Sequence, residues 1–387
     1  MVTALKSDLA MSLTASRGEL KKAMSVLGRV ADKRSALPML GGVAIKVGRD
    51  STTFTATDLN MWATYTTQDR ARIPGAAVIK AKSIADILGK MPDGEITIAG
   101  ENPHVYLMSG SASVHVDSYV ARDYPKVPDT SALTWISVDG GDVAACIKRV
   151  ISHVCQDETR FHLNGVYLHC EGKRLRAVAT DGHRLAFASS SYDDAYQTLF
   201  ARGMILPTKG LKEVVKLVGK GGSIEMARDE KAPHMLHVRK DRWEISLKAV
   251  DAQFPPYEQV VPKSNNHAVA VDIAGFRGAC ERAKVVNGAT HGTLIQRFND
   301  SPMLRLATGR DERIEEEVPG TLGDAFKVGV SPKYLVDALE HMESRTSKVE
   351  IMIGAELDPI LMFSHDENPG ASPFTMRHFV VVMPMRI

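Results

Sequence analysis

The residues best suited to chemistry stand together at positions 180–185, where the sequence reads Thr-Asp-Gly-His-Arg-Leu. Asp181 and His183, two positions apart, could orient one another as a general acid–base pair. The sequence holds no G-x-S-x-G elbow, phosphate-binding loop or dinucleotide fingerprint to accompany them. Asp-Gly is also an ordinary turn signal at the end of a strand. We therefore interpret Gly182, His183 and Arg184 as the polar rim of an apolar pocket, with a hydrolytic enzyme using Asp181 and His183 as an alternative.

The same stretch closes a segment that the chain repeats. Residues 40–58 and 163–181 each run from a Gly-Val pair through a polar turn to Thr-Asp, and the Gly and the Asp are 16 residues apart in both. A fainter third copy covers 292–308. After Asp58 the first copy has Leu and Asn where the second has Gly and His. One fold built several times is expected, and catalysis at a single copy is disfavoured.

Proline-containing segments mark the ends of larger units. Their last prolines, Pro128, Pro262 and Pro384, lie 134 and then 122 residues apart. That spacing suits ordinary domains and is far too long for a solenoid repeat. Three tandem domains are therefore predicted, at 11–132, 133–263 and 264–387. A flexible tail, residues 1–10, is expected to precede them.

Apolar residues at helical spacing predict two helices in each domain. The six predicted helices are 16–30, 83–91, 142–155, 208–218, 272–286 and 331–342. Ser16 is expected to cap the first of them. Short alternating or β-branched runs, separated by Gly- and Pro-containing turns, predict strands that outnumber the helices. The expected fold class is α+β, with two helices packed on antiparallel sheet in each domain.

Composition limits the class of protein without naming its task. The 387 residues are 44% hydrophobic and 24% charged, without an apolar run long enough to span a membrane. The first ten residues lack the apolar core of a secretory signal. Four cysteines without a C-x-x-C pair predict buried free thiols in a reducing cytosol. Thirteen histidines without an H-x-x-x-H pair predict no metal site.

Basic side chains gather on five of the six predicted helices, although the formal net charge is only +2. Lys209, Lys212 and Lys216 recur at helical spacing, which places most of this group on one side. Solvated helix faces are one interpretation. The other is a surface, assembled from several helices, that follows duplex phosphates without reading bases. No aromatic residues interleave with the lysines, so stacking on single strands is not predicted.

Several motifs together resemble the bacterial sliding clamp family, the β subunit of DNA polymerase III. They are Met-Ser-Leu-Thr at 11–14, Leu-Pro-Met-Leu at 37–40, Arg160 with Leu-Asn-Gly-Val at 163–166, Val-Ala-Thr-Asp-Gly-His-Arg-Leu-Ala at 178–186, Phe254-Pro255 with Tyr257, and Met-Pro-Met-Arg at 383–386. The resemblance covers the chain from Met11 onward in the family's order and spacing. The third domain is least typical between 309 and 374.

The resemblance implies a DNA clamp fold in which two chains close head to tail into a ring. Helices would line the hole and sheets would form the outer wall, so that duplex DNA is held topologically. Such a ring is a processivity factor without catalysis, cofactor or metal, and it tethers a polymerase to its template. The expected partners are duplex DNA, the replicative polymerase, the clamp loader and other clamp-motif peptides. The expected location is the cytoplasm, at the nucleoid, with no membrane partner.

The resemblance also implies three sets of site residues. A pocket between the second and third domains would bind partner peptides, using Leu163, Thr180, Gly182, His183, Arg184, Leu185, Pro255, Val260, Tyr334, Val381, Met383, Pro384, Met385 and Arg386. The residues expected to face DNA are Arg34, Gln156, Lys148, Arg149, Lys209 and Lys212. The dimer interface would place Val114 and Val116 against Val285 and Val286.

Three departures from the family pattern concern the choice of peptide rather than the ring. Many relatives carry a basic residue where this chain has Gln259, and the last residue is Ile387 rather than Leu. Phe161 and His162 stand where an aromatic pair is frequent. A clamp-like paralogue with altered partner choice, such as a phage or plasmid copy or an inhibitor-tolerant variant, is therefore a further alternative.

Overall fold

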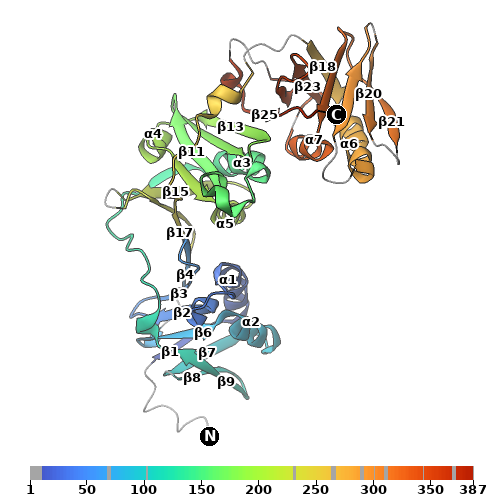
Figure 1. Ribbon diagram of the computed structural model, residues 1–387. Helices are drawn as coiled ribbons and strands as arrows, with labels where there is room; N and C mark the ends of the chain where they lie inside the picture. The colour runs from blue at the N-terminus through green and yellow to red at the C-terminus, as the bar shows by residue number, and fades with distance from the viewer. Residues whose placement is uncertain are drawn as a thin grey trace. The chain divides into compact units, whose positions relative to one another are not determined.

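The chain forms two compact units in a computed structural model (Figure 1). The described residues are 11–67, 71–101, 103–229, 232–262, 267–287, 292–299, 301–308, 313–342, 344–367 and 372–386. Unit 1 combines Met1–Val138 with Ser223–Ala249, and unit 2 combines Asp139–Gly222 with Val250–Ile387. The predicted tail at 1–10 lies outside the described residues.

Unit 1 is built on a 13-stranded sheet with the order β10-β15-β16-β17-β4-β3-β2-β6-β9-β8-β7-β1-β5. The strands are β1 (Met11–Ser16), β2 (Gly42–Val47), β3 (Thr52–Thr57), β4 (Met61–Thr67), β5 (Ala71–Ile73), β6 (Gly75–Lys80), β7 (Glu95–Glu101), β8 (His104–Ser109), β9 (Ala112–Tyr119), β10 (Ile136–Asp139), β15 (Ser223–Arg228), β16 (Met235–Lys240) and β17 (Trp243–Lys248). β17 pairs antiparallel with β4, with Ile245 opposite Ala63. That pairing makes one sheet from segments far apart in the sequence.

Helices α1 (Arg17–Val30) and α2 (Ala81–Lys90) lie together on one face of this sheet (Figure 1). α1 buries Leu20, Met24 and Leu27, which recur at three- and four-residue intervals and so form one apolar stripe. Both helices begin within two residues of the predicted positions. Ser16 is the N-cap residue, but its side chain makes no capping hydrogen bond, so that detail of the prediction is wrong.

Unit 2 contains an eight-stranded sheet, β14-β11-β12-β13-β25-β24-β23-β18, and a four-stranded sheet, β21-β20-β19-β22. The strands are β11 (Gly165–Glu171), β12 (Arg174–Thr180), β13 (Arg184–Tyr192), β14 (Met204–Pro207), β18 (His267–Asp272), β19 (Thr293–Arg297), β20 (Met303–Thr308), β21 (Ile314–Pro319), β22 (Phe326–Val330), β23 (Lys348–Ile353), β24 (Ile360–Ser364) and β25 (His378–Val382). The helices are α3 (Gly140–Val150), α4 (Ala195–Phe200), α5 (Thr208–Val218), α6 (Ile273–Asn287) and α7 (Pro332–Leu339).

Strands β13 and β25 join the second and third repeats into one sheet. Leu185 lies opposite Val381, and Phe187 lies opposite Phe379 with the two rings stacked 4.7 Å apart. These residues belong to a buried apolar cluster that extends to Leu163 in the second repeat. A shared core of this kind resists separation of the two repeats, because pulling them apart would expose its apolar surface to water.

The predicted α+β class with antiparallel sheet and helices is confirmed. Two helices are shorter than predicted. The one expected at 142–155 ends at Val150 and continues as a 3-10 turn, Ile151–His153, and the one expected at 331–342 ends at Leu339. The short helix α4 was not predicted, because six residues are too few to show a helical period. The four cysteines are free, as expected, and three of them are buried. No helix within the described residues is long and apolar enough to cross a membrane.

Candidate functional site

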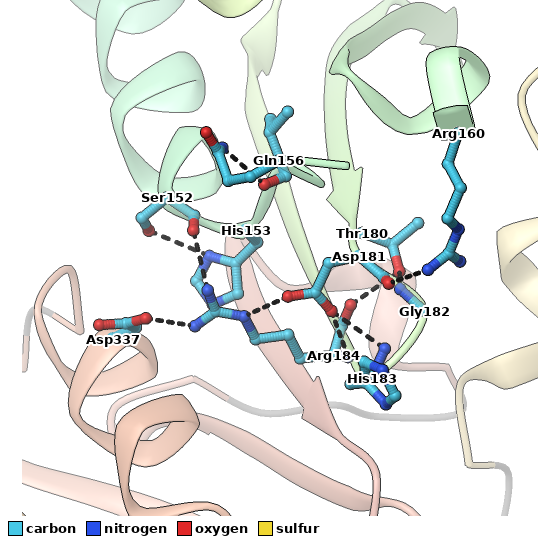
Figure 2. Close-up of polar contacts among 11 residues, drawn as sticks. Ser152, His153, Gln156, Arg160, Thr180, Asp181, Gly182, His183, Arg184 and Asp337 are labelled. Carbon is cyan, nitrogen blue, oxygen red and sulfur yellow. Dashed lines mark hydrogen bonds and ion pairs between the residues drawn. The ribbon is translucent and has the colours of Figure 1, made fainter. Parts of the chain in front are cut away.

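The segment from Thr180 to Arg184 forms a tight turn between β12 and β13 (Figure 2). Asp181 Oδ1 accepts hydrogen bonds from the backbone N–H groups of His183 at 3.0 Å and Arg184 at 3.1 Å. The Thr180 hydroxyl donates to the carbonyl of Arg184 at 2.7 Å and accepts from the N–H of Gly182 at 3.1 Å. Side chains of Asp and Thr commonly stabilise turns in this way.

The first repeat builds the same turn between β3 and β4. Asp58 Oδ1 accepts from the N–H groups of Asn60 and Met61, at 3.1 and 2.9 Å. The Thr57 hydroxyl donates to the carbonyl of Met61 and accepts from the N–H of Leu59. The internal repeat predicted from the 16-residue spacing is thus a structural one. Because both aspartates serve their own turn, the Asp181 carboxylate is not free to act as a general base.

Arg184 is a buried cross-link rather than a rim residue. Its side chain is only 5% exposed, its Nε lies 3.0 Å from Asp181 Oδ2, and its Nη1 lies 2.6 Å from Asp337 Oδ2 on α7 (Figure 2). Nη2 donates to the carbonyl of Ser152 at 3.0 Å. The guanidinium also lies 4.7 Å from the centre of the Tyr334 ring. This corrects the expectation that Arg184 would meet ligands on the rim, because its donors already have partners.

Arg160 supports the turn from the other side. Its Nη1 donates to the carbonyl of Asp181 at 2.9 Å. Gly182 has φ +89°, and a Cβ added there would lie 2.6 Å from Nη2 of Arg160. The positive φ favours glycine, and a Cβ would in addition displace the end of the Arg160 side chain.

The exposed part of the site is formed by His183 and the C-terminal segment. The His183 ring is stacked on Tyr334 with the centroids 6.2 Å apart. The N–H of Met383 donates to the carbonyl of His183 at 2.9 Å, and the N–H of Met385 donates to the carbonyl of Gly329 on β22 at 2.7 Å. Burial raises the pKa of the Tyr334 hydroxyl, and the nearby Asp181 carboxylate raises it further, which keeps the hydroxyl protonated.

Apart from Arg184, the residues predicted to line the pocket separate into three groups by their exposure. Leu163, Leu185 and Val381 are buried together in the apolar cluster. Those partly open to solvent are Thr180, Pro255, Tyr334, Met383, Pro384 and Met385. Gly182, His183 and Arg386 are exposed, and Val260 is 36% exposed. The buried group can shape a binding surface only from beneath, while the second group and the exposed residues can contact a ligand.

Two buried histidines lie close to this site. His153, which follows α3, neighbours Arg184 (Figure 2), and His378 lies on β25. Burial lowers the pKa of His153 well below its ordinary value, and the Arg184 cation lowers it further. Burial lowers the pKa of His378, and the positive charge of Arg149 lowers it further, to about 3. Both rings are therefore neutral near pH 7.

Basic residues predicted to face DNA lie on α3 and α5, which pack against one another. Lys148 and Arg149 line a cavity of about 450 Å³ together with Lys220 and His341. Lys209 and Lys212 are exposed on α5. Gln156 is exposed beyond the end of α3, and Arg34 is exposed in unit 1 after α1. The structure thus leaves all six predicted residues at least partly accessible to a polyanion.

The predicted interface residues lie at two exposed edges. Val114 and Val116 on β9 are half-buried. The first six residues of β9 pair with β8 alone among the described strands, because β6 reaches only Ser118 and Tyr119. Val285 is 83% exposed on α6, which packs against β20 and the edge strand β21. An unpaired strand edge and an exposed apolar helix residue are both features that a partner chain can cover.

Sequence reasoning missed the supporting residues of the site. Asp337 is 153 positions from Arg184, and Ser152 contributes a backbone carbonyl that no motif can show. His153 likewise has no spacing pattern that marks it. The pairing of β13 with β25 and the packing of α7 on β25 bring Asp337 to Arg184, and the packing of the turn Ile151–His153 on β12 and β13 brings Ser152 and His153.

The repeated α+β domains and the antiparallel sheets shared between them define a tandem-domain clamp fold. The chain matches the family profiles described as DNA polymerase III beta subunit, N-terminal domain over residues 11–128, central domain over 137–256 and C-terminal domain over 258–378. It therefore belongs to the DNA polymerase III β subunit family, the bacterial sliding clamps, which are non-catalytic processivity factors in DNA replication.

Individual relatives agree over the full length. The chain is 25% identical to the beta sliding clamp of Caulobacter vibrioides, with 97% of this chain and 100% of the relative covered. It is 27% identical to the beta sliding clamp of Pseudomonas aeruginosa, again over 97% and 100%. A crystal structure of the DNA polymerase III subunit beta from Pseudomonas aeruginosa superposes with a TM-score of 0.87 at 27% identity, covering 97% and 100% of the two chains.

Proposed function

We propose that two copies of this chain close head to tail into a ring around duplex DNA, with the first domain of each copy meeting the third domain of the other. The observation that supports this most directly is the edge of β9 beside Val114 and Val116, which no other described strand pairs with. Val285 and Val286, near the end of α6, supply the apolar counterpart in the third domain. A head-to-tail contact generates a closed ring when its rotation closes.

The inner surface is proposed to hold DNA by charge alone. The basic residues on α3 and α5 are suited to contact phosphates. Such contacts carry no sequence information, and the affinity that they provide falls steeply as the salt concentration rises. Few such contacts are needed when the ring itself prevents escape. Topological retention also explains how a chain with a net charge of only +2 can remain on DNA.

The exposed residues around the Asp181 turn are proposed to bind short peptides of the replicative polymerase, the clamp loader and other replication proteins. His183 and Tyr334 present stacked rings, and Met383 and Met385 add adaptable apolar side chains. This surface would tether each partner to the ring and raise its effective concentration at the template. The domain limits 11–132, 133–263 and 264–387, and a location at the nucleoid, are part of the same proposal.

DNA topology provides the direct test of the ring. The purified chain should have a mass near twice 42.2 kDa by light scattering. After loading by a clamp loader it should be retained on nicked circular DNA and lost when the circle is linearised, because a ring can slide off an end. Equal retention on both DNA forms, or a monomer that ignores topology, would contradict the proposal.

Peptide binding requires a separate test. Fluorescence anisotropy of a labelled polymerase peptide measures its affinity for the chain. The peptide should bind the wild type, and it should bind His183→Ala much more weakly while the mass of the dimer stays unchanged. His365→Ala is the matched control, because His365 is an exposed histidine paired with Glu350 elsewhere in unit 2. Unchanged affinity in His183→Ala would place the peptide site elsewhere.

The altered residues Gln259 and Ile387 favour a second candidate, a clamp-like paralogue with different partners. A panel of peptides from several replication proteins separates the two. The paralogue would form the ring and be retained on circles, yet it would not bind the replicative polymerase peptide.

A further inference from the structure

A compact group of potential metal ligands lies on β8 and β9 in unit 1 and includes none of the residues predicted to contact peptides or DNA. Among the described residues, His104, His115 and Asp117 are one group of three whose ligand atoms all lie within 4.8 Å of one another. The Nε2 of His115 lies 2.7 Å from the Nδ1 of His104. The Nδ1 of His104 lies 3.8 Å from the Asp117 carboxylate.

The hairpin register brings these residues together. β8 and β9 are joined by a short turn in which Ser109 pairs with Ala112. This turn places His104 opposite Asp117 and Tyr106 opposite His115. Alternate residues of a strand point to the same face, so all four side chains share one face of the sheet. That face is opposite the buried one, which holds Val105 and Leu107.

The arrangement is close to what a tetrahedral metal centre requires. Zn²⁺ binds imidazole nitrogen and carboxylate oxygen at about 2.0–2.2 Å, so neighbouring ligand atoms are roughly 3.3 Å apart. The observed separations of 2.7 and 3.8 Å bracket this value. His104 and Asp117 are 53% and 87% exposed, so small rotations can equalise the distances. The Tyr106 ring packs beside the His115 ring, with the two centroids 5.4 Å apart.

The donor set indicates the kind of metal. Two imidazoles and one carboxylate suit borderline divalent transition metals such as Zn²⁺, whereas Mg²⁺ and Ca²⁺ prefer all-oxygen ligands. Three protein ligands at an exposed surface leave a coordination position for water, as in open zinc sites.

We propose that His104, His115 and Asp117 bind a Zn²⁺-like transition-metal ion and that the bound ion cross-links β8 to β9. This site is independent of the proposed peptide and DNA contacts. It departs from the expectation of no metal site, which rested on spacing along a helix. Here the second and third ligands follow the first by 11 and 13 positions across a hairpin, a spacing that helix-based motifs do not cover.

Calorimetric titration of the tag-free, chelator-treated full-length chain with ZnCl₂ tests the proposal. One Zn²⁺ per chain should bind. His104→Ala and His115→Ala should each weaken binding by more than about 100-fold, beyond the effect usual for residues that only support ligands. His365→Ala, which alters an exposed histidine with a single carboxylate neighbour, should bind as the wild type does.

Co²⁺ gives an independent readout, because its visible absorption reports the ligands directly. The wild-type chain should give an absorption band that disappears in His115→Ala and is unaffected by excess Mg²⁺. Circular dichroism establishes that the variants are folded. Absence of Zn²⁺ binding up to millimolar concentration, or wild-type binding in both histidine variants, would overturn the proposal.

Discussion

Asp181 and His183 have side chains that suggest catalysis, yet the contacts that the Asp181 carboxylate makes are structural. Both oxygens of the Asp181 carboxylate are used, one by two backbone N–H groups of the turn and the other by Nε of Arg184. The contact recorded between Asp181 and His183 involves the backbone of His183. The Asp181 carboxylate therefore stabilises the turn and binds the Arg184 guanidinium, rather than pairing with the His183 ring.

Removal of the Arg184 side chain should destabilise unit 2. Arg184→Ala leaves Asp181 and Asp337 close together without their shared cation. Breaking a buried ion pair typically costs about 3–5 kcal/mol, and partial exposure of the two carboxylates reduces this to about 2–4 kcal/mol. Urea unfolding measures the loss. The matched control is Arg277→Ala, an exposed i,i+4 pair with Glu281 that should cost about 0.3–0.5 kcal/mol. Similar losses in both variants would contradict the assigned role.

A substitution at Gly182 should cost more than one at another left-handed glycine. Gly182→Ala combines a φ of +89° with a Cβ placed 2.6 Å from Arg160 Nη2. Gly172→Ala has φ +58° and no neighbour within 4 Å, so it reports backbone strain alone. We expect about 1 kcal/mol for Gly172→Ala and a larger loss for Gly182→Ala. Equal unfolding free energies would show that Arg160 simply moves away.

At the scale of elements, the pairing of β13 with β25 organises the site. It carries Arg184 opposite Val382 and leads the C-terminal segment past His183 to Gly329. The helices were predictable because their apolar stripes follow the helical period. The pairing was not predictable, because its partners, such as Arg184 and Val382, are 198 positions apart and no local pattern links them. Burial of His378 on β25 also creates a pH dependence of stability.

Stability should fall in acid because of His378. Its folded pKa is about 3, below the ordinary value of about 6.5, so the unfolded chain binds a proton that the native chain excludes. The stabilising effect is complete above about pH 6.5 and is lost as the pH falls toward 3. Between pH 7 and 5 this histidine should account for about 1–2 kcal/mol of lost stability. Urea unfolding of His378→Gln at both pH values should show a smaller loss than the wild type. Identical losses would exclude His378 as the cause.

At the scale of the whole molecule, the proposed function depends on assembly. Unit 1 offers a strand edge and unit 2 offers an exposed apolar residue on α6. The Val285 side chain is 83% exposed, so it contributes little to the core of a single copy. The persistence of both features on the surface is what a head-to-tail partner would explain.

A charge at Val285 should open the ring. Val285→Glu places a carboxylate where the interface must exclude water, so light scattering should give a mass near 42.2 kDa. Leu357→Glu is the control, because Leu357 is also exposed but lies in the turn between β23 and β24. That variant should keep the dimer mass. A dimeric, folded Val285→Glu would remove α6 from the interface.

The sequence by itself determined the repeats, the α+β class, the positions of most helices and the family resemblance. These features depend on local periodicity and on residues that are close in the chain, such as Thr180 to Leu185. Only the tertiary structure decided that Arg184 is buried against Asp337, that the Arg160 guanidinium lies beside Gly182, and that His104 meets His115 and Asp117. Those contacts depend on strand register and on packing between distant elements, and neither is encoded in the spacing of any single segment.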